Sequence, residues 1–139
     1  MTDDAMTRDE VHDLLRRMFA AFTDPAAAPK DFAELLTPDY VQYVDGEQLD
    51  YAGFLAHHEA LRQSVVSASV SFEHVVTDGA SAATVHVAEA VKLSGERVRL
   101  KVIAYFQFRD HRICVVDELT HMLEGEARDR DLGSRTLRR

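Results

Sequence analysis

The spacing of apolar residues changes near the middle of this chain, at about Ser67. Before that point apolar residues recur every three or four positions, as in Val11, Leu14 and Met18, which is the period of an amphipathic helix. After it they alternate with polar residues, as in ASVSFEHVV, AATVHVAEAVKL and RVRLKVIAYFQF, which is the period of strands. Helices followed by strands predict an α+β domain rather than a parallel α/β sheet.

About three helices are expected in the first half of the chain. The first begins near Arg8, because Thr7 and Glu10 have the spacing of a capping box. A short second helix is expected to turn Phe32 inward. The stretch LDYAGFLAHHEALRQS predicts the third, with Asp50 as its cap. A short strand, YVQYVDG, is expected between the second and third helices.

Four strands are expected from Ser67 onward, joined by TDGA, SGE and RDHR. Short links of this kind predict an antiparallel meander. The last predicted strand, ICVVDELTHML, closes a domain of residues 1–124. Residues 125–139 are predicted to be a polar tail that folding does not require, because they offer little apolar surface to bury.

Composition limits the partners of this chain. It has 139 residues, with 24 acidic and 16 basic side chains and a net charge of −8. No basic stripe is present, so a nucleic-acid partner is not expected. No apolar run approaches the ~18 residues of a membrane span, so no membrane partner is expected either. Cys114 is the only cysteine, which rules out an internal disulfide and favours a cytoplasmic location.

Three stretches of the sequence carry a family resemblance: LLTPDYVQYVDG, YAGFLAHHEALR and VIAYFQFRDHRICVVDELTH. Together with the order of the predicted elements, they make residues 8–123 resemble the nuclear-transport-factor-2-like superfamily, and its SnoaL-like branch in particular. The resemblance implies a cone, in which about three N-terminal helices pack on a strongly curved, mainly antiparallel sheet and leave an apolar pocket. Relatives include isomerases, cyclases, epoxide hydrolases and proteins without catalysis, so function must be argued from the site.

The last strand carries the main candidate for chemistry, Glu118. Alternation places Cys114, Val116 and Glu118 on one side, and Ile113 and Asp117 on the other. The residues alone leave open which side faces the pocket, and resemblance to an epoxide-hydrolase strand favours the Glu118 side. A carboxyl group in an apolar pocket has a raised pKa, which suits a general acid. The alternative is that Glu118 lies on the wet convex face or pairs with an arginine.

Tyr43, His57 and His58 are the other candidate catalytic residues. Tyr43 stands where the resemblance to steroid isomerases would place an aspartate, and its phenol could donate a hydrogen bond to a substrate oxygen. A buried tyrosine bonded to backbone is the alternative. His57 and His58 are adjacent on a helix, so only one can point inward, where it could pair with Glu118. A hydrogen-bonded core histidine is the alternative for either.

An apolar ligand site is expected around these residues. Its predicted members are Phe19, Phe54, Leu61, Val102, Ala104, Phe106 and Val116. The side chains that steroid isomerases need are replaced by Phe19, Tyr43 and Ala104, and TVHVAEAVKL lacks the arginine of the epoxide-hydrolase pattern. The remaining histidines, including His86, are interpreted as incidental. Neither a metal nor a cofactor is expected.

These features predict a domain that binds a hydrophobic small molecule in an apolar pocket. Its enzymatic form would be a cofactor-free isomerase, cyclase, dehydratase or hydrolase that uses Glu118 as acid or base. The alternatives are a ligand-binding protein without turnover and a dimeric interaction module. A homodimer is expected, because relatives commonly pair through the convex face of the sheet, where Ile103 and Tyr105 would otherwise form an exposed apolar patch.

Overall fold

The structure is a computed structural model that describes residues 5–129. Two α-helices are present, and both begin where the sequence predicts. Helix α1 (Arg8–Thr23) has a complete capping box, in which the Thr7 hydroxyl accepts from the Glu10 amide at 3.1 Å and the Glu10 carboxylate accepts from the Thr7 amide at 2.9 Å. Helix α2 (Tyr51–Ser64) is capped by Asp50, which accepts from the Gly53 amide at 2.8 Å.

The predicted second helix is reduced to one 3₁₀ turn, η1 (Pro29–Phe32). The expectation of about three helices is therefore not confirmed for residues 5–129. Leu36 is already the first residue of a strand. Pro38 gives the physical reason, because a residue that precedes proline is restricted to extended conformations.

Six strands form one mixed sheet in the order β2-β1-β6-β5-β4-β3. They are β1 (Leu36–Val44), β2 (Glu47–Asp50), β3 (Val65–Thr77), β4 (Ser81–Lys92), β5 (Arg97–Arg109) and β6 (Arg112–Glu124). Strands β3 to β6 form the predicted antiparallel meander. Strand β1 adds to β6 in parallel, and the unpredicted β2 folds back on β1 through Asp45 and Gly46, which have φ of 51° and 87°.

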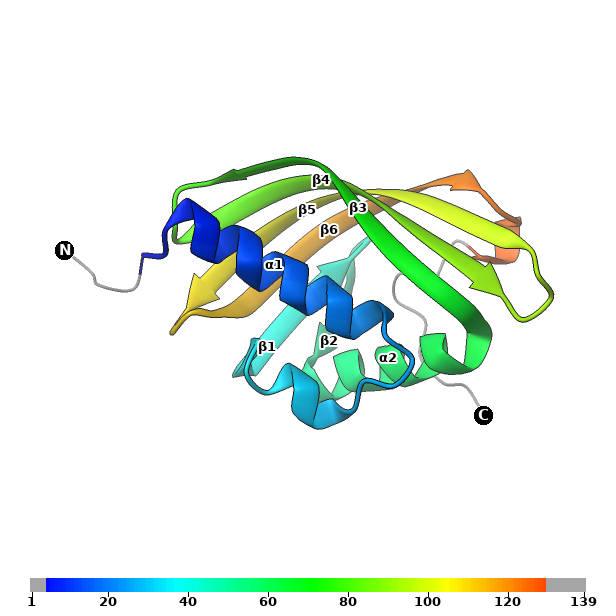
Figure 1. The fold of residues 1–139 in the computed structure, drawn as a ribbon, viewed down its shortest axis with the longest axis horizontal. Coiled ribbons are helices and arrows are strands. Elements are labelled where there is room, and N and C mark those ends of the chain that lie inside the picture. The colour runs from blue at the N-terminus through cyan, green and yellow to red at the C-terminus, as the bar shows by residue number, and fades with distance from the viewer. Residues whose placement is uncertain (1–4, 130–139) are drawn as a thin grey trace.

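The long strands arch over the helices, as Figure 1 shows. Helix α1 lies beneath the concave side of β3 to β6, and α2 lies below it near β1 and β2. The apolar core fills the space between the concave face and the helices. Its members include Leu14, Leu15 and Met18 of α1, Phe54 of α2, and Leu100, Val102 and Phe106 of β5. This is the curved α+β architecture that the sequence predicted.

The start of the predicted C-terminal tail is packed against the domain. Residues Ala127–Asp129 form a 3₁₀ turn, η2, and Asp129 is only 2% exposed. Its carboxylate lies 3.2 Å from the ammonium nitrogen of Lys92 and accepts from the Glu126 amide at 3.1 Å. Residues 125–129 therefore dock on the domain through a buried ion pair, and that folding does not require the tail stays a prediction. Residues 130–139 lie outside the described part.

Within residues 5–129, neither α-helix has the length and apolar character needed to cross a bilayer.

Candidate functional site

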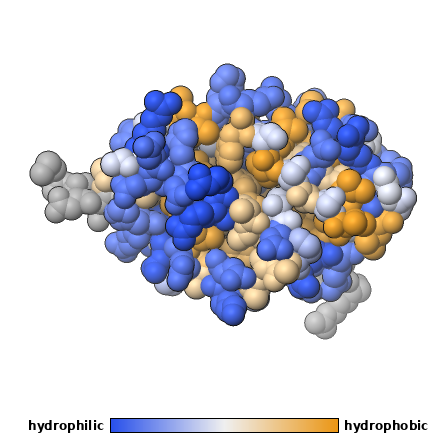
Figure 2. All heavy atoms as spheres, viewed as in Figure 1, coloured by the Kyte–Doolittle hydropathy of each residue, from blue (hydrophilic) through white to orange (hydrophobic). Residues whose placement is uncertain are grey.

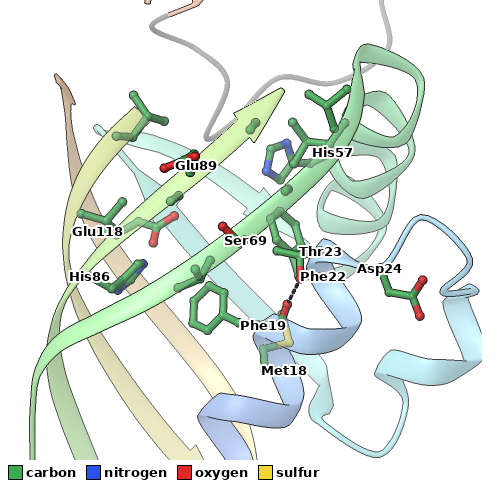
Figure 3. Close-up of a pocket in the computed structure, with 18 of the residues that line it drawn as sticks. Met18, Phe19, Phe22, Thr23, Asp24, His57, Ser69, His86, Glu89 and Glu118 are labelled. Carbon is green, nitrogen blue, oxygen red and sulfur yellow. Dashed lines mark hydrogen bonds between the residues drawn. The ribbon is translucent and has the colours of Figure 1, made fainter. Parts of the chain in front are cut away.

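A cavity lies between the two helices and the concave face of the sheet (Figure 3). Its volume is about 130 Å³. That is room for roughly ten waters. Most of the lining is apolar, with Met18, Phe19, Phe22, Phe54, Leu61, Val98, Leu100, Val102, Phe106, Ile113 and Val116. An apolar cavity with a few polar groups is the usual form of a small-molecule site.

Glu118 is one of the acidic residues that line this cavity. It lies on β6, with Ala104 of β5 and Val44 of β1 as its neighbours across the ladders. Its carboxyl group is enclosed by protein, although one side of it is open to the cavity. Burial raises its pKa to about 8, and the nearby charges of Asp45 and Asp117 add to this effect. Glu118 therefore lies on the cavity side of β6, and Asp117 is exposed on the other side.

A β-bulge changes the face of the residues before Val116. Val115 pairs with Gln107 and Ile113 pairs with Phe108, so Cys114 has no partner across the ladder. Two residues then oppose one, which interrupts the alternation. Ile113 lines the cavity and Cys114 does not. The predicted grouping of Cys114 with Val116 and Glu118 is therefore wrong.

The two adjacent histidines of α2 have different environments. His57 is buried and lines the cavity, with its ring 5.4 Å from that of Phe22. His58 is buried away from the cavity against Phe32, at 5.0 Å, and desolvation lowers its pKa. Figure 3 shows His57 on the helix side of the cavity, across from Glu118 on the sheet. The predicted pairing of a histidine from this helix with Glu118 is not formed.

Tyr43 and Ala104, both predicted at the site, do not line the cavity. Alternation along β1 turns Tyr40 and Gln42 inward instead, and the Tyr40 hydroxyl donates to the Gln42 side chain at 2.6 Å. Ala104 is buried on the concave face beside Glu118, but its methyl group is too short to reach the cavity. The other predicted members do line it: Phe19, Phe54, Leu61, Val102, Phe106 and Val116.

His86 lines the cavity although the sequence interpretation treated it as incidental. It lies on β4 and is 2% exposed, with its ring 5.0 Å from Phe19 and 5.5 Å from Phe72. Its Nδ1 lies 2.8 Å from the Thr84 hydroxyl, and burial lowers its pKa to about 4. The signal for it is a row in which small residues surround one histidine: Ala82, Thr84, His86, Ala88 and Ala90.

The rim of the cavity lies where the loop after α1 meets α2 and the start of β3. Arg62 of α2 holds the loop after α1 in place, because its Nε donates to the Pro25 carbonyl at 2.9 Å. Its guanidinium also pairs with Glu59 at 2.6 Å. Val66 is exposed beside it. Figure 2 shows apolar surface between strongly hydrophilic regions on the face that carries α1, α2 and β3.

Metal ligation finds no support in the part of the chain that the structure describes. No three His, Cys, Asp or Glu side chains converge there as a metal would require. The candidate chemistry of the cavity is therefore that of Glu118 and the histidines.

Comparison with known proteins matches this fold. The family model of the SnoaL-like domain matches residues 15–116. An uncharacterised protein of the fission yeast Schizosaccharomyces pombe is 45% identical over 120 residues, which cover 86% of this chain and 92% of that protein.

Solved structures share the fold at low identity. TsrD from Streptomyces laurentii has a TM-score of 0.73 at 19% identity and covers 94% of this chain and 99% of its own. An LEH-like epoxide hydrolase from M. tuberculosis has a TM-score of 0.68 at 16% identity, covering 91% of this chain and 90% of its own. The match over most of the domain shows that the chain belongs to the SnoaL-like family of the nuclear-transport-factor-2-like superfamily.

Proposed function

We propose that this protein is a cofactor-free acid/base enzyme that acts on an uncharged, largely apolar small molecule, with Glu118 as its proton donor. The observation that carries the proposal is the Glu118 carboxyl group, which lies in an apolar cavity without a basic partner among residues 5–129. Its pKa of about 8 keeps it protonated at neutral pH. A carboxylic acid that titrates near neutrality is suited to general acid catalysis.

The reaction class is an isomerisation, cyclisation, dehydration or hydrolysis. The epoxide hydrolase with the same fold supports the last of these by analogy of fold alone. Strand β4 carries no arginine, so the charged pattern of that enzyme class is absent and Glu118 would act without it. His57, at the opposite side of the cavity, is the candidate base. His58 and Tyr43 have no role in the proposal, because neither lines the cavity.

Two simple probes test this proposal. Styrene oxide reports hydrolysis, and 2-tetralone in D₂O reports enolisation through deuterium uptake next to its carbonyl group. We expect the protein to accelerate at least one reaction at pH 7, and Glu118→Gln to reduce that rate by about 10²- to 10⁴-fold, the usual contribution of a general acid. The exposed Glu34→Gln is the matched control and should leave the rate unchanged.

A ligand-binding protein without turnover is the second candidate, and the apolar lining of the cavity favours it. The same experiment separates the two functions. If the probes raise the melting temperature but react no faster with the native protein than with Glu118→Gln, the cavity binds and does not catalyse. If styrene oxide and 2-tetralone neither raise the melting temperature nor react faster, the ligand is neither an epoxide nor a ketone of this kind. The proposed chemistry is then wrong for both probes.

We also propose a homodimer that forms through the convex face of the sheet. Ile103 of β5 and Leu119 of β6 lie directly opposite each other and are 59% and 65% exposed. Tyr105, on the same face, is 42% exposed. Neighbouring apolar side chains that lie open to solvent mark an association surface. A second copy of the same face would cover them.

A cytoplasmic location is a further proposal. Cys114 is the only cysteine of the chain, and it is buried at the bulge of β6. A free thiol of this kind is compatible with a reducing compartment. Imaging of the protein with a fluorescent tag checks the location, and accumulation in an oxidising compartment would contradict it.

A further inference from the structure

Two buried polar groups in the cavity lack a partner from the protein. The Glu118 carboxyl group makes no hydrogen bond or ion pair with residues 5–129, and neither does Nε2 of His86. Buried polar groups nearly always have a partner, which is either protein, water or ligand. Since both groups belong to the lining, the cavity itself must supply that partner.

The hydrogen bond between Thr84 and His86 defines where the imidazole proton lies. The Thr84 side chain is 2% exposed, and the only acceptor in reach of its hydroxyl among the described residues is Nδ1 of His86, at 2.8 Å. We assign the hydroxyl as the donor and Nδ1 as the acceptor, because this direction gives the buried hydroxyl proton an acceptor. A neutral imidazole that accepts at Nδ1 carries its proton on Nε2. Burial keeps His86 neutral, so it presents an N–H donor to the cavity.

The sheet holds this donor and the Glu118 carboxyl group on one face. Thr84, Ala104 and Glu118 form one row across β4, β5 and β6, and His86 lies in the adjacent row. Ala104, between Thr84 and Glu118, contributes only a methyl group. Figure 3 shows Glu118 and His86 on the sheet side of the cavity, with their polar ends turned toward its interior. No hydrogen bond joins the two among the described residues, and both side chains line the same cavity.

We infer that Glu118 and His86 act together as two neutral donors, O–H and Nε2–H, that bind one oxygen atom of an uncharged ligand. The inference rests on the proposed function and adds a ligand class to it: a ketone, aldehyde or cyclic ether. Such an oxygen has two lone pairs and can accept both bonds. Donors fixed in an apolar cavity stabilise negative charge that develops on that oxygen during a reaction. The carboxylates of Asp45 and Asp117 near Glu118 disfavour a ligand that is already an anion.

The position of the proton on His86 is the first test. Nitrogen-15 NMR of the histidine-labelled protein at pH 7, with the His86 signals assigned by their loss in His86→Gln, distinguishes the two tautomers. We expect the Nε2–H form in the native protein and a loss of this preference in Thr84→Val, which removes the hydroxyl and keeps the shape. A proton on Nδ1 in the native protein would overturn the inference.

Binding of 2-tetralone, compared with its hydrocarbon analogue tetralin, is the second test. We expect the ketone to bind more tightly than the hydrocarbon and its carbonyl stretch to fall in the infrared spectrum on binding. Glu118→Leu and His86→Leu should each weaken ketone binding by about 10-fold, the effect of one hydrogen bond, and leave tetralin binding unchanged. His86→Gln, whose amide can donate, should recover part of the loss.

Equal binding of 2-tetralone and tetralin, or a carbonyl stretch that either leucine variant leaves unchanged, would overturn the inference. Thermal melts of both variants check that they fold. None of these measurements depends on turnover, so the two proposals can fail separately. An absence of catalysis with both donors detected contradicts only the proposed enzyme, whereas catalysis without the His86 contribution contradicts only the two-donor site.

Discussion

The carboxylate of Asp45 accepts two hydrogen bonds from Thr120, one from the backbone amide at 2.8 Å and one from the hydroxyl at 2.5 Å. The amide of Asp45 in turn donates to the carbonyl of Glu118 at 3.0 Å. Asp45 thereby extends the pairing of β1 with β6 beyond the end of β1. It also places a negative charge close to the Glu118 carboxyl group, which it helps to keep protonated.

Asp45→Asn should lower the pKa of Glu118. The asparagine oxygen can still accept from the Thr120 amide, so the turn is kept while the charge is removed. The pKa should fall from about 8 but stay above its ordinary value, because burial is the larger cause of the shift. Carbon-13 NMR of the Glu118 carboxyl carbon during a pH titration measures this. Glu47→Gln, a neighbouring exposed acid, is the control, and an unchanged titration in Asp45→Asn would contradict the role of Asp45.

Stability should fall as pH rises through the titration of Glu118. The folded-state pKa of about 8 lies above the ordinary value of 4.5 for a glutamate, so the folded protein holds this proton more tightly than the unfolded chain. The contribution is complete below about pH 4.5 and is lost as the pH approaches 8. Glu118→Gln removes this dependence and should stabilise the protein at pH 9, relative to the native chain, by about 1–3 kcal/mol.

Chemical denaturation of both proteins between pH 5 and pH 9 checks that expectation. The difference in free energy of unfolding between the variant and the native chain should grow steadily over this range. A constant difference would show that the Glu118 carboxyl group is solvated and titrates normally, and the proposed general acid would then lose its basis.

Asp129→Ala should destabilise the domain although it lies beyond the predicted domain boundary. Asp129 is buried against Lys92, which is itself mostly buried, and its removal takes away the carboxylate nearest to the Lys92 ammonium, at 3.2 Å. We expect a loss of about 1–3 kcal/mol. Glu96→Ala is the matched control, because Glu96 also faces Lys92, at 3.8 Å, but is exposed, and its loss should cost less than about 1 kcal/mol. Similar melting temperatures for the two variants would contradict a structural role of the Asp129 contact.

Ile103→Lys should convert the proposed dimer to a monomer. The substitution places a charge in the middle of the apolar patch that Ile103 shares with Leu119, and a charge there opposes burial. Light scattering at micromolar concentration should give the mass of two chains for the native protein and of one for the variant. Leu93→Lys, at an exposed position of the turn between β4 and β5, is the control and should remain dimeric. A monomeric native protein would refute the dimer directly.

Local signals in the sequence predicted most elements of this fold. The capping box of Thr7 and Glu10 and the cap at Asp50 each involve residues a few positions apart. The sequence therefore predicted where both helices begin. The turn at residues 109–112 has its two middle residues, Asp110 and His111, at φ of 56° and 59°, as a tight hairpin requires. Helix caps and tight turns depend on residues that are neighbours along the chain, so they can be predicted from the sequence.

The missed features depend on contacts between distant segments. The parallel pairing of β1 with β6 and the bulge at Cys114 follow from how strands meet in space. The bulge in turn decides that Ile113 rather than Cys114 faces the cavity. His86 was missed for the same reason. Whether a histidine on a strand belongs to a site depends on the face it occupies and on its partners, here Thr84. The pattern predicted Glu118 correctly only because the bulge lies before it.

The position of β6 in the sheet has a consequence for the order in which the protein forms during synthesis. This strand is the last of the six in the chain, yet it lies between β1 and β5 and joins them. Until it leaves the ribosome, the helices with β1 and β2 and the hairpins of β3 to β5 lack the strand that connects them in the sheet. Domains generally fold as units once enough of the chain is available. The last strand to emerge therefore both completes the sheet and delivers Glu118 into a cavity that did not exist before it.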